Sequence, residues 1–228
     1  MERELRVITS HAPELRAADD SPPILEGFAA VFNSYSRNLG GFVEQVDPVA
    51  FRDTLARGGN VLGLMNHDPN MLLADTASGT LTLSTDATGL RYAMELDPSD
   101  PDAQRVMAKV RTRKMRGSSF AFRAIKDEWG TTEQGFPLRT LLAVELYDVS
   151  SVSQPAYLAT EADGLSVALR SLASSVGAPL DRLVDAARSN TLAQFMGGAP
   201  VVESPAAPSF PSRSQWSARF GVRPPVGS

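Results

Sequence analysis

The chain has 228 residues, 43% of them hydrophobic and 21% charged, which is typical of a soluble globular protein with one well-buried domain and appendages. Its net charge of -4 argues against a nucleic-acid partner, which would need a basic face, and no apolar run approaches the roughly 20 residues of a membrane span. The absence of cysteine excludes disulfides, thiolate nucleophiles and thiolate metal sites.

Residues 1–23 are expected to form a flexible N-terminal segment. The alternation of Leu5, Val7 and Thr9 is weak, and the segment ends in the polar, proline-containing residues 19–23. The N-terminus also lacks an apolar signal core, which predicts that the protein is made in the cytosol and is not exported by that route.

Residues 24–160 have the pattern of one folded domain that is rich in strands. Apolar or alternating runs bounded by turn residues predict strands at residues 24–32, 60–65, 79–84, 90–96, 118–125 and 138–152. The runs at 79–84 and 90–96 are joined by a short turn and should pair as a hairpin.

Two short helices are expected within this domain. Asp47 has the position of an N-cap and Pro48 that of the first helical residue, which predicts a helix through about residue 56. Asp100 and Pro101 give the same signal for a second helix, and the cations near its end suit a helix C-terminus.

The remainder of the chain is expected to be a helical extension at residues 161–198 and a tail at residues 199–228. Residues 179–196 carry apolar side chains at helical spacing and predict one amphipathic helix, which Gly197 and Gly198 end. Prolines dominate the tail, which predicts disorder and either a linker or a docking segment.

The predicted elements define the fold class. Strands dominate, the helices are short, and strands and helices do not alternate as they would in a parallel sheet. We therefore predict a mainly β protein with peripheral helices (α+β), built as an antiparallel barrel or sandwich.

The segment around Ser118 and Ser119 supplies a candidate nucleophile. Successive side chains of a strand point to opposite faces, so Ser118 shares a face with Phe120 and Phe122 and should point into the core. Ser119 shares the other face with the small Ala121, which would leave room for a substrate backbone. The sequence favours Ser119 as the nucleophile, although both serines could simply decorate a strand end.

His67 is the candidate general base. The chain has two histidines, and His11 lies in a polar, proline-flanked segment where it is expected to be solvated. His67 follows an apolar run within Asn66-His67-Asp68, and an unperturbed imidazole pKa of about 6.5 suits it to proton transfer at neutral pH. With so few ligands, a catalytic zinc site is not expected, and no glycine-rich segment has the spacing of a phosphate-binding loop.

Asp148 and Glu145 compete for the third role, which is to orient the imidazole. Strict alternation with Leu142, Val144 and Leu146 would place Asp148 on an apolar face, where a carboxylate needs a partner such as an imidazolium. Glu145 would lie on the opposite face and is more simply explained as a solvated residue, so it is the runner-up.

Several motifs occur in one order, and together they resemble the tailed-phage prohead (capsid maturation) serine proteases, relatives of the herpesvirus assemblins. The resemblance covers roughly residues 24–160. The motifs are GFAAVFN at 27–33, FVEQVDPVAF at 42–51, NHD at 66–68, GTLTL at 79–83, GSSFAF at 117–122 and LYDVS at 146–150, followed by QPAY at 154–157.

The resemblance implies an assemblin-like antiparallel β-barrel without a cofactor. By motif, His67 takes the position of the general base, Ser119 that of the nucleophile and Asp148 that of the third member. Two residues depart from the family pattern: Ala121 stands where the family commonly has Gly, and Asp148 stands where it usually has Glu. The shorter carboxylate makes the third assignment the weakest of the three.

The resemblance also implies the protein's function and surroundings. A member of this family is a serine endopeptidase that cleaves scaffold or capsid delta segments, and often itself, inside the assembling procapsid in the host cytoplasm. Its partners would be the major capsid protein, the scaffolding protein or both, and a homo-oligomer is compatible with this role. The alternative is a capsid scaffold or assembly factor that keeps the fold without enzymatic activity. An unrelated esterase is disfavoured because the chain lacks a Gly-x-Ser-x-Gly elbow.

Overall fold

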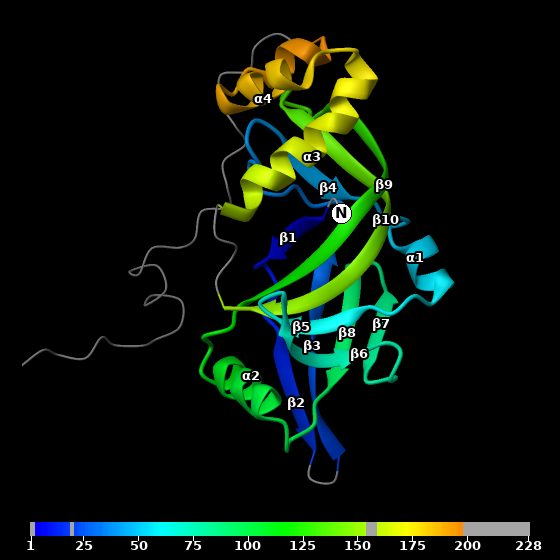
Figure 1. Ribbon diagram of the computed structural model, residues 1–228, viewed down its shortest axis with the longest axis vertical. Coiled ribbons are helices and arrows are strands. Elements are labelled where there is room, and N and C mark those ends of the chain that lie inside the picture. The colour runs from blue at the N-terminus through cyan, green and yellow to red at the C-terminus, as the bar shows by residue number, and fades with distance from the viewer. Residues whose placement is uncertain (1–2, 19–20, 154–158, 198–228) are drawn as a thin grey trace, which may run out of the picture.

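The computed structural model describes residues 3–18, 21–153 and 159–197, and Figure 1 shows its strands gathered in the middle of the molecule with helices around them. The strands are β1 (Glu4–Ile8), β2 (Glu14–Ala18), β3 (Ser21–Val31), β4 (Val43–Val46), β5 (Leu62–Met65), β6 (Asp68–Asp75), β7 (Leu81–Thr85), β8 (Gly89–Glu95), β9 (Gly117–Thr131) and β10 (Pro137–Val152). The helices are α1 (Arg52–Arg57), α2 (Pro101–Arg111), α3 (Ala159–Val176), α4 (Leu180–Arg188) and the 3-10 helix η1 (Leu192–Met196).

The strands form two sheets. The six-stranded sheet has the order β1-β9-β10-β5-β6, with β4 also paired to β10, and the four-stranded sheet has the order β2-β3-β8-β7. The predicted hairpin is present as β7 and β8. The mainly β class with peripheral helices is confirmed.

The sheets differ in two respects from the expected antiparallel barrel. Neither sheet closes on itself in the described part of the chain, because β1 and β6 end one strand order and β2 and β7 end the other. The larger sheet is also mixed. β4 pairs in parallel with the first part of β10, and β5 pairs in parallel with its last part. The crossover through α1 connects β4 to β5 and allows both strands to run in the direction of β10.

The main hydrophobic core lies between the two sheets. Leu25, Tyr92 and Met94 of the smaller sheet are fully buried against Phe120 and Phe122 of β9. The rings of Phe120 and Phe122 stack with centroids 4.9 Å apart, which places the face of β9 that carries them on the core side, as alternation predicts. The other face of β9 is thereby left for the candidate site.

The N-terminal segment is ordered rather than flexible over most of its length. Residues 4–8 form β1 at the edge of the larger sheet, and residues 14–18 form β2 in the smaller one. The hydrophobic pattern of residues 4–8 is weak because the side chains that hold β1 in place are charged. Glu4 is 1% exposed and makes an ion pair with Arg139, a residue distant in sequence.

The helices match the prediction in part. Asp100 caps α2 by accepting a hydrogen bond from the backbone N–H of Asp102 at 2.9 Å, as expected. The first helix begins at Arg52 instead of Pro48, because the side chain of Asp47 caps a preceding turn through the N–H of Val49 at 2.9 Å.

The C-terminal helices pack on a second, smaller core around Phe42, Leu169, Leu172 and Leu183. Figure 1 shows α3 running alongside β1 and β9, with α4 beyond it. The single helix predicted at 179–196 is divided into α4 and η1, because Asn190 adopts a left-handed conformation with φ 58°. None of the described helices is long and apolar enough to span a membrane. The predicted tail at 199–228 lies outside the described residues.

Candidate active site

Ser118 and Ser119 point to opposite sides of β9, as alternation predicts. The Ser118 hydroxyl lies 2.9 Å from the hydroxyl of Tyr92 within the core, and burial raises the pKa of Tyr92 well above its usual value. Ser119 Oγ lies 2.6 Å from Nε2 of His67. Ser118 is therefore a core serine, and Ser119 is the serine that meets the histidine.

His67 lies in the tight turn between β5 and β6. Asn66 and His67 both have left-handed backbones, with φ 57° and 58°, a conformation in which Asn and His are enriched among non-glycine residues. Hydrogen bonds to β10 and the residue after it hold the turn. Asn66 Oδ1 accepts from the N–H of Ser153 at 3.0 Å, and the N–H of His67 donates to Ser150 Oγ at 3.1 Å. This turn fixes the imidazole above Ser119.

Asp148 completes a row of three side chains. Its Oδ1 lies 2.6 Å from Nδ1 of His67, and the residue is 2% exposed. With the Nδ1 proton donated to this carboxylate, Nε2 is the ring nitrogen free to accept a proton from Ser119. A hydroxyl, an imidazole and a carboxylate thus stand in the order that nucleophilic acyl transfer uses.

A β-bulge places Asp148 on the face of Ser119, which strict alternation did not predict. Leu146 of β10 lies opposite Phe122 of β9, but Asp148 lies opposite Ala121, so one residue on β10 has no counterpart on β9. The extra residue moves Asp148 away from the apolar face of Leu146. From the bulge onward, Asp148 and then Ser150 lie opposite the residues that share the face of Ser119.

Glu145, the runner-up, is not part of this row. Its carboxylate pairs with Arg123 at 2.9 Å and accepts a hydrogen bond from the hydroxyl of Tyr147 at 3.1 Å. The solvated role that the sequence favoured for Glu145 agrees with these contacts.

Two further residues at the site were missed by sequence reasoning. Ser150 Oγ donates to Asp148 Oδ1 at 3.0 Å and also lies 3.1 Å from Nδ1 of His67. Its spacing of two residues from Asp148 on a strand could have identified it. Arg3 contacts the other carboxylate oxygen of Asp148, and nothing in its sequence surroundings indicates this contact.

Ser119 is fully buried, which differs from the open position expected for it. The reason is β1, which pairs antiparallel with β9 and places Val7 opposite Ser119. The Ser119 hydroxyl also donates a hydrogen bond to the backbone carbonyl of Arg6 at 2.8 Å.

No metal-ligating cluster accompanies these residues. Within residues 3–18, 21–153 and 159–197, no group of three or more His, Cys, Asp or Glu side chains could hold a metal ion. The site's polar contacts are instead made by Ser119, His67, Asp148, Ser150 and Arg3.

The ordered row of Ser119, His67 and Asp148 on a mainly β scaffold is the arrangement of a serine hydrolase. Comparison with protein-family models refines this class: the model described as caudovirus prohead serine protease matches residues 11–175, and the chain belongs to that family. This membership supports a role as a capsid maturation protease.

Among solved structures, the chain is similar to the capsid assembly protease gp21 of bacteriophage T4, with 14% sequence identity and a TM-score of 0.47. The similarity covers 68% of this chain and 100% of that one. A comparison with curated proteins found no match.

Proposed function

We propose that the protein is a serine endopeptidase that cleaves the major capsid protein, the scaffolding protein or both, and also itself, during prohead assembly. The observation that carries this proposal is the row Ser119 Oγ, His67 Nε2 and Nδ1, and Asp148 Oδ1, with both contacts at 2.6 Å. Family membership supports the capsid maturation role and supports action in the assembling procapsid in the host.

The geometry supports a two-step hydrolysis in which His67 transfers the protons. Ser119 Oγ attacks the carbonyl carbon of the scissile peptide bond while His67 Nε2 takes the hydroxyl proton. The imidazolium then gives that proton to the leaving amine, and the C–N bond breaks to leave an ester on Ser119. A water molecule, deprotonated by His67, hydrolyses the ester and restores the serine.

Asp148 and Ser150 act on His67 and do not react themselves. The Asp148 carboxylate stabilises the imidazolium and fixes the proton on Nδ1. Ser150 positions both partners, since its hydroxyl donates to Asp148 and accepts from the backbone N–H of His67.

The experiment that tests the proposal is co-expression with the phage's capsid and scaffolding proteins, followed by intact-mass analysis. The native chain should yield discrete fragments, and Ser119→Ala should yield none while remaining folded. Ser151→Ala is the matched control, because Ser151 is also a buried strand serine but its hydroxyl donates to the sulfur of Met115, at 3.5 Å, and not to His67 or Asp148.

The outcomes separate the enzyme from the non-enzymatic scaffold. Fragments that persist in Ser119→Ala would reject Ser119 as the nucleophile. Intact partner proteins with the native chain would reject the enzyme and favour the assembly factor.

Replacing Ser150 by Ala is expected to lower the rate of cleavage by about tenfold, because one hydrogen bond to a charged group is lost. The backbone N–H of His67 would lose its acceptor as well, so a modest loss of stability should accompany the change. Cleavage rate and the thermal unfolding midpoint measure the two effects. Ser151→Ala again serves as the control, and an unchanged cleavage rate in Ser150→Ala would show that Ser150 does not position the site.

A further inference from the structure

The strand β1 covers the edge of β9 beside Ser119, where an extended peptide could otherwise pair with the sheet. It pairs antiparallel with β9 from Ile8 opposite Ser118 to Glu4 opposite Phe122, and β10 occupies the other edge of β9. Figure 1 shows β1 beside β9 at the end of the larger sheet. An extended peptide added to an exposed edge strand would lie in this position.

The backbone of β1 engages the nucleophile itself. Ser119 Oγ donates its hydrogen bond to the carbonyl oxygen of Arg6 at 2.8 Å, although His67 Nε2 lies 2.6 Å away. The hydroxyl has one proton, so donation to Arg6 competes with donation to the general base. In an attack on a peptide bond, the hydroxyl oxygen must face the carbonyl carbon while other donors hold the carbonyl oxygen. Here the carbonyl oxygen faces the hydroxyl, which is a bound but unreactive arrangement.

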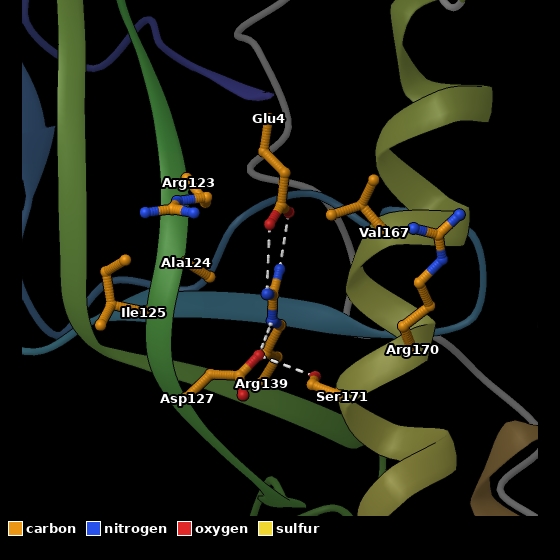
Figure 2. A pocket seen from close by; sticks show the side chains of 9 residues that line it. All are labelled: Glu4, Arg123, Ala124, Ile125, Asp127, Arg139, Val167, Arg170 and Ser171. Atoms are coloured by element: carbon orange, nitrogen blue, oxygen red, sulfur yellow. Dashed lines mark hydrogen bonds and ion pairs between the residues drawn. The ribbon is translucent and has the colours of Figure 1, made fainter. Parts of the chain in front are cut away.

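The side chains of β1 are held by a buried charge cluster, defined by Glu4, Arg6, Glu44, Asp127 and Arg139. Arg139 Nη1 lies 2.6 Å from Glu4, and Arg6 Nε lies 2.6 Å from Glu44. Figure 2 shows Glu4 pointing onto the Arg139 guanidinium beside α3. Both residues line a pocket with a volume of about 180 Å³. The cluster therefore receives an acidic side chain from the strand that lies along β9.

If β1 left, the buried cation Arg139 would still have carboxylate partners in the cluster. Glu4 and Arg6 would depart together, one negative and one positive group. Arg139 would keep Glu44 at 3.0 Å and Asp127 at 2.5 Å as partners. The region that matches the family model begins at residue 11, after β1.

We propose that the edge of β9 beside Ser119 is the binding site for the substrate strand, and that β1 occupies it as an inhibitory pseudosubstrate. The inference rests on the proposed protease function. The substrate is an extended peptide with an acidic side chain where Glu4 lies, recognised by Arg139. Release of β1 frees the Ser119 hydroxyl for His67 and opens the edge for that peptide.

A reversible tether in the full chain tests the proposal. Leu5 of β1 lies opposite Ala121 of β9, and the chain has no native cysteine, so Leu5→Cys with Ala121→Cys provides a disulfide lock of compatible strand geometry. The readout is the rate at which a fluorophosphonate probe labels Ser119, located by peptide mass mapping. We expect labelling at least about tenfold slower in the oxidised form than in the reduced form. Ala121→Cys alone should show no effect of oxidation.

A charge substitution tests, without a tether, whether the ion pair of Glu4 with Arg139 keeps β1 on β9. Glu4→Gln should speed labelling of Ser119 by roughly tenfold, because it removes the charge that Arg139 binds. Glu14→Gln, in the exposed part of β2, should leave the rate at the native value.

The outcomes distinguish this inference from the proposed function. Equal rates in the oxidised and reduced forms, or no acceleration by Glu4→Gln, would overturn the pseudosubstrate role while Ser119 remains a reactive nucleophile. No labelling of Ser119 in any of the forms would contradict the protease function, and the inference with it.

Discussion

Replacing Asp148 by Ala is expected to lower the rate of cleavage by about 10³ to 10⁴-fold. The carboxylate lies 2.6 Å from His67 Nδ1 and is almost fully buried, so solvent screens its charge only weakly. Without it, the imidazolium formed during attack by Ser119 loses its nearest anion, and Ser150 is left as the hydrogen-bonding side chain at Nδ1.

Glu145→Ala is the matched control for this prediction. Glu145 lies on the same strand three residues earlier, is partly exposed, and pairs with Arg123, so its loss should change the rate by less than twofold (roughly the effect of an exposed ion pair on a distant site). The rate of fragment formation in co-expression and the rate of probe labelling at Ser119 both measure the effect. A large loss with Glu145→Ala and a small one with Asp148→Ala would exchange their assigned roles.

The side-chain directions of Ser118 and Ser119 on β9 show what a local sequence pattern can predict. Alternation alone separates Ser118 from Ser119, and the structure has Ser118 at Tyr92 in the core and Ser119 at His67. The same reasoning failed for Asp148, because the side of the sheet to which its side chain points depends on a bulge in the pairing of β10 with β9. Register between strands is a property of two segments together, and a single strand sequence does not reveal where an extra residue will be accommodated.

The N-terminal segment shows a second limit of sequence reasoning. Residues 4–8 were expected to be flexible because their hydrophobic pattern is weak, yet Glu4 and Arg6 are held by Arg139 and Glu44. These partners are far away in the chain, and charged residues in a sequence are normally interpreted as solvated. Long-range ion pairs and the pairing with β9 both hold β1 in place, and a local sequence pattern predicts neither of them.

The charge cluster leads to a second large effect: Arg139→Met is expected to lower the free energy of unfolding by about 3–5 kcal/mol at neutral pH. Arg139 is 1% exposed and pairs with Glu4, Glu44 and Asp127. Its removal would leave three buried or nearly buried carboxylates with Arg6 as their remaining cation in the cluster. Arg123→Met is the matched control, because the pair of Arg123 with Glu145 is partly exposed and should contribute less than about 1 kcal/mol.

The pH dependence of this loss separates charge from packing. Burial alone would raise the pKa of Glu4, but the charges and hydrogen bonds of Arg6 and Arg139 outweigh it and hold the pKa below its usual value. In the native protein, the stability that Glu4 contributes is therefore present above its unfolded pKa and is lost as pH falls through the lowered folded pKa. Without Arg139 the Glu4 carboxylate protonates more readily, so the stability gap between the native protein and Arg139→Met should narrow as pH falls from 7 to about 4. Chemical unfolding across this range measures the gap, and a gap that stays constant with pH would assign the loss to packing instead of to the buried charges.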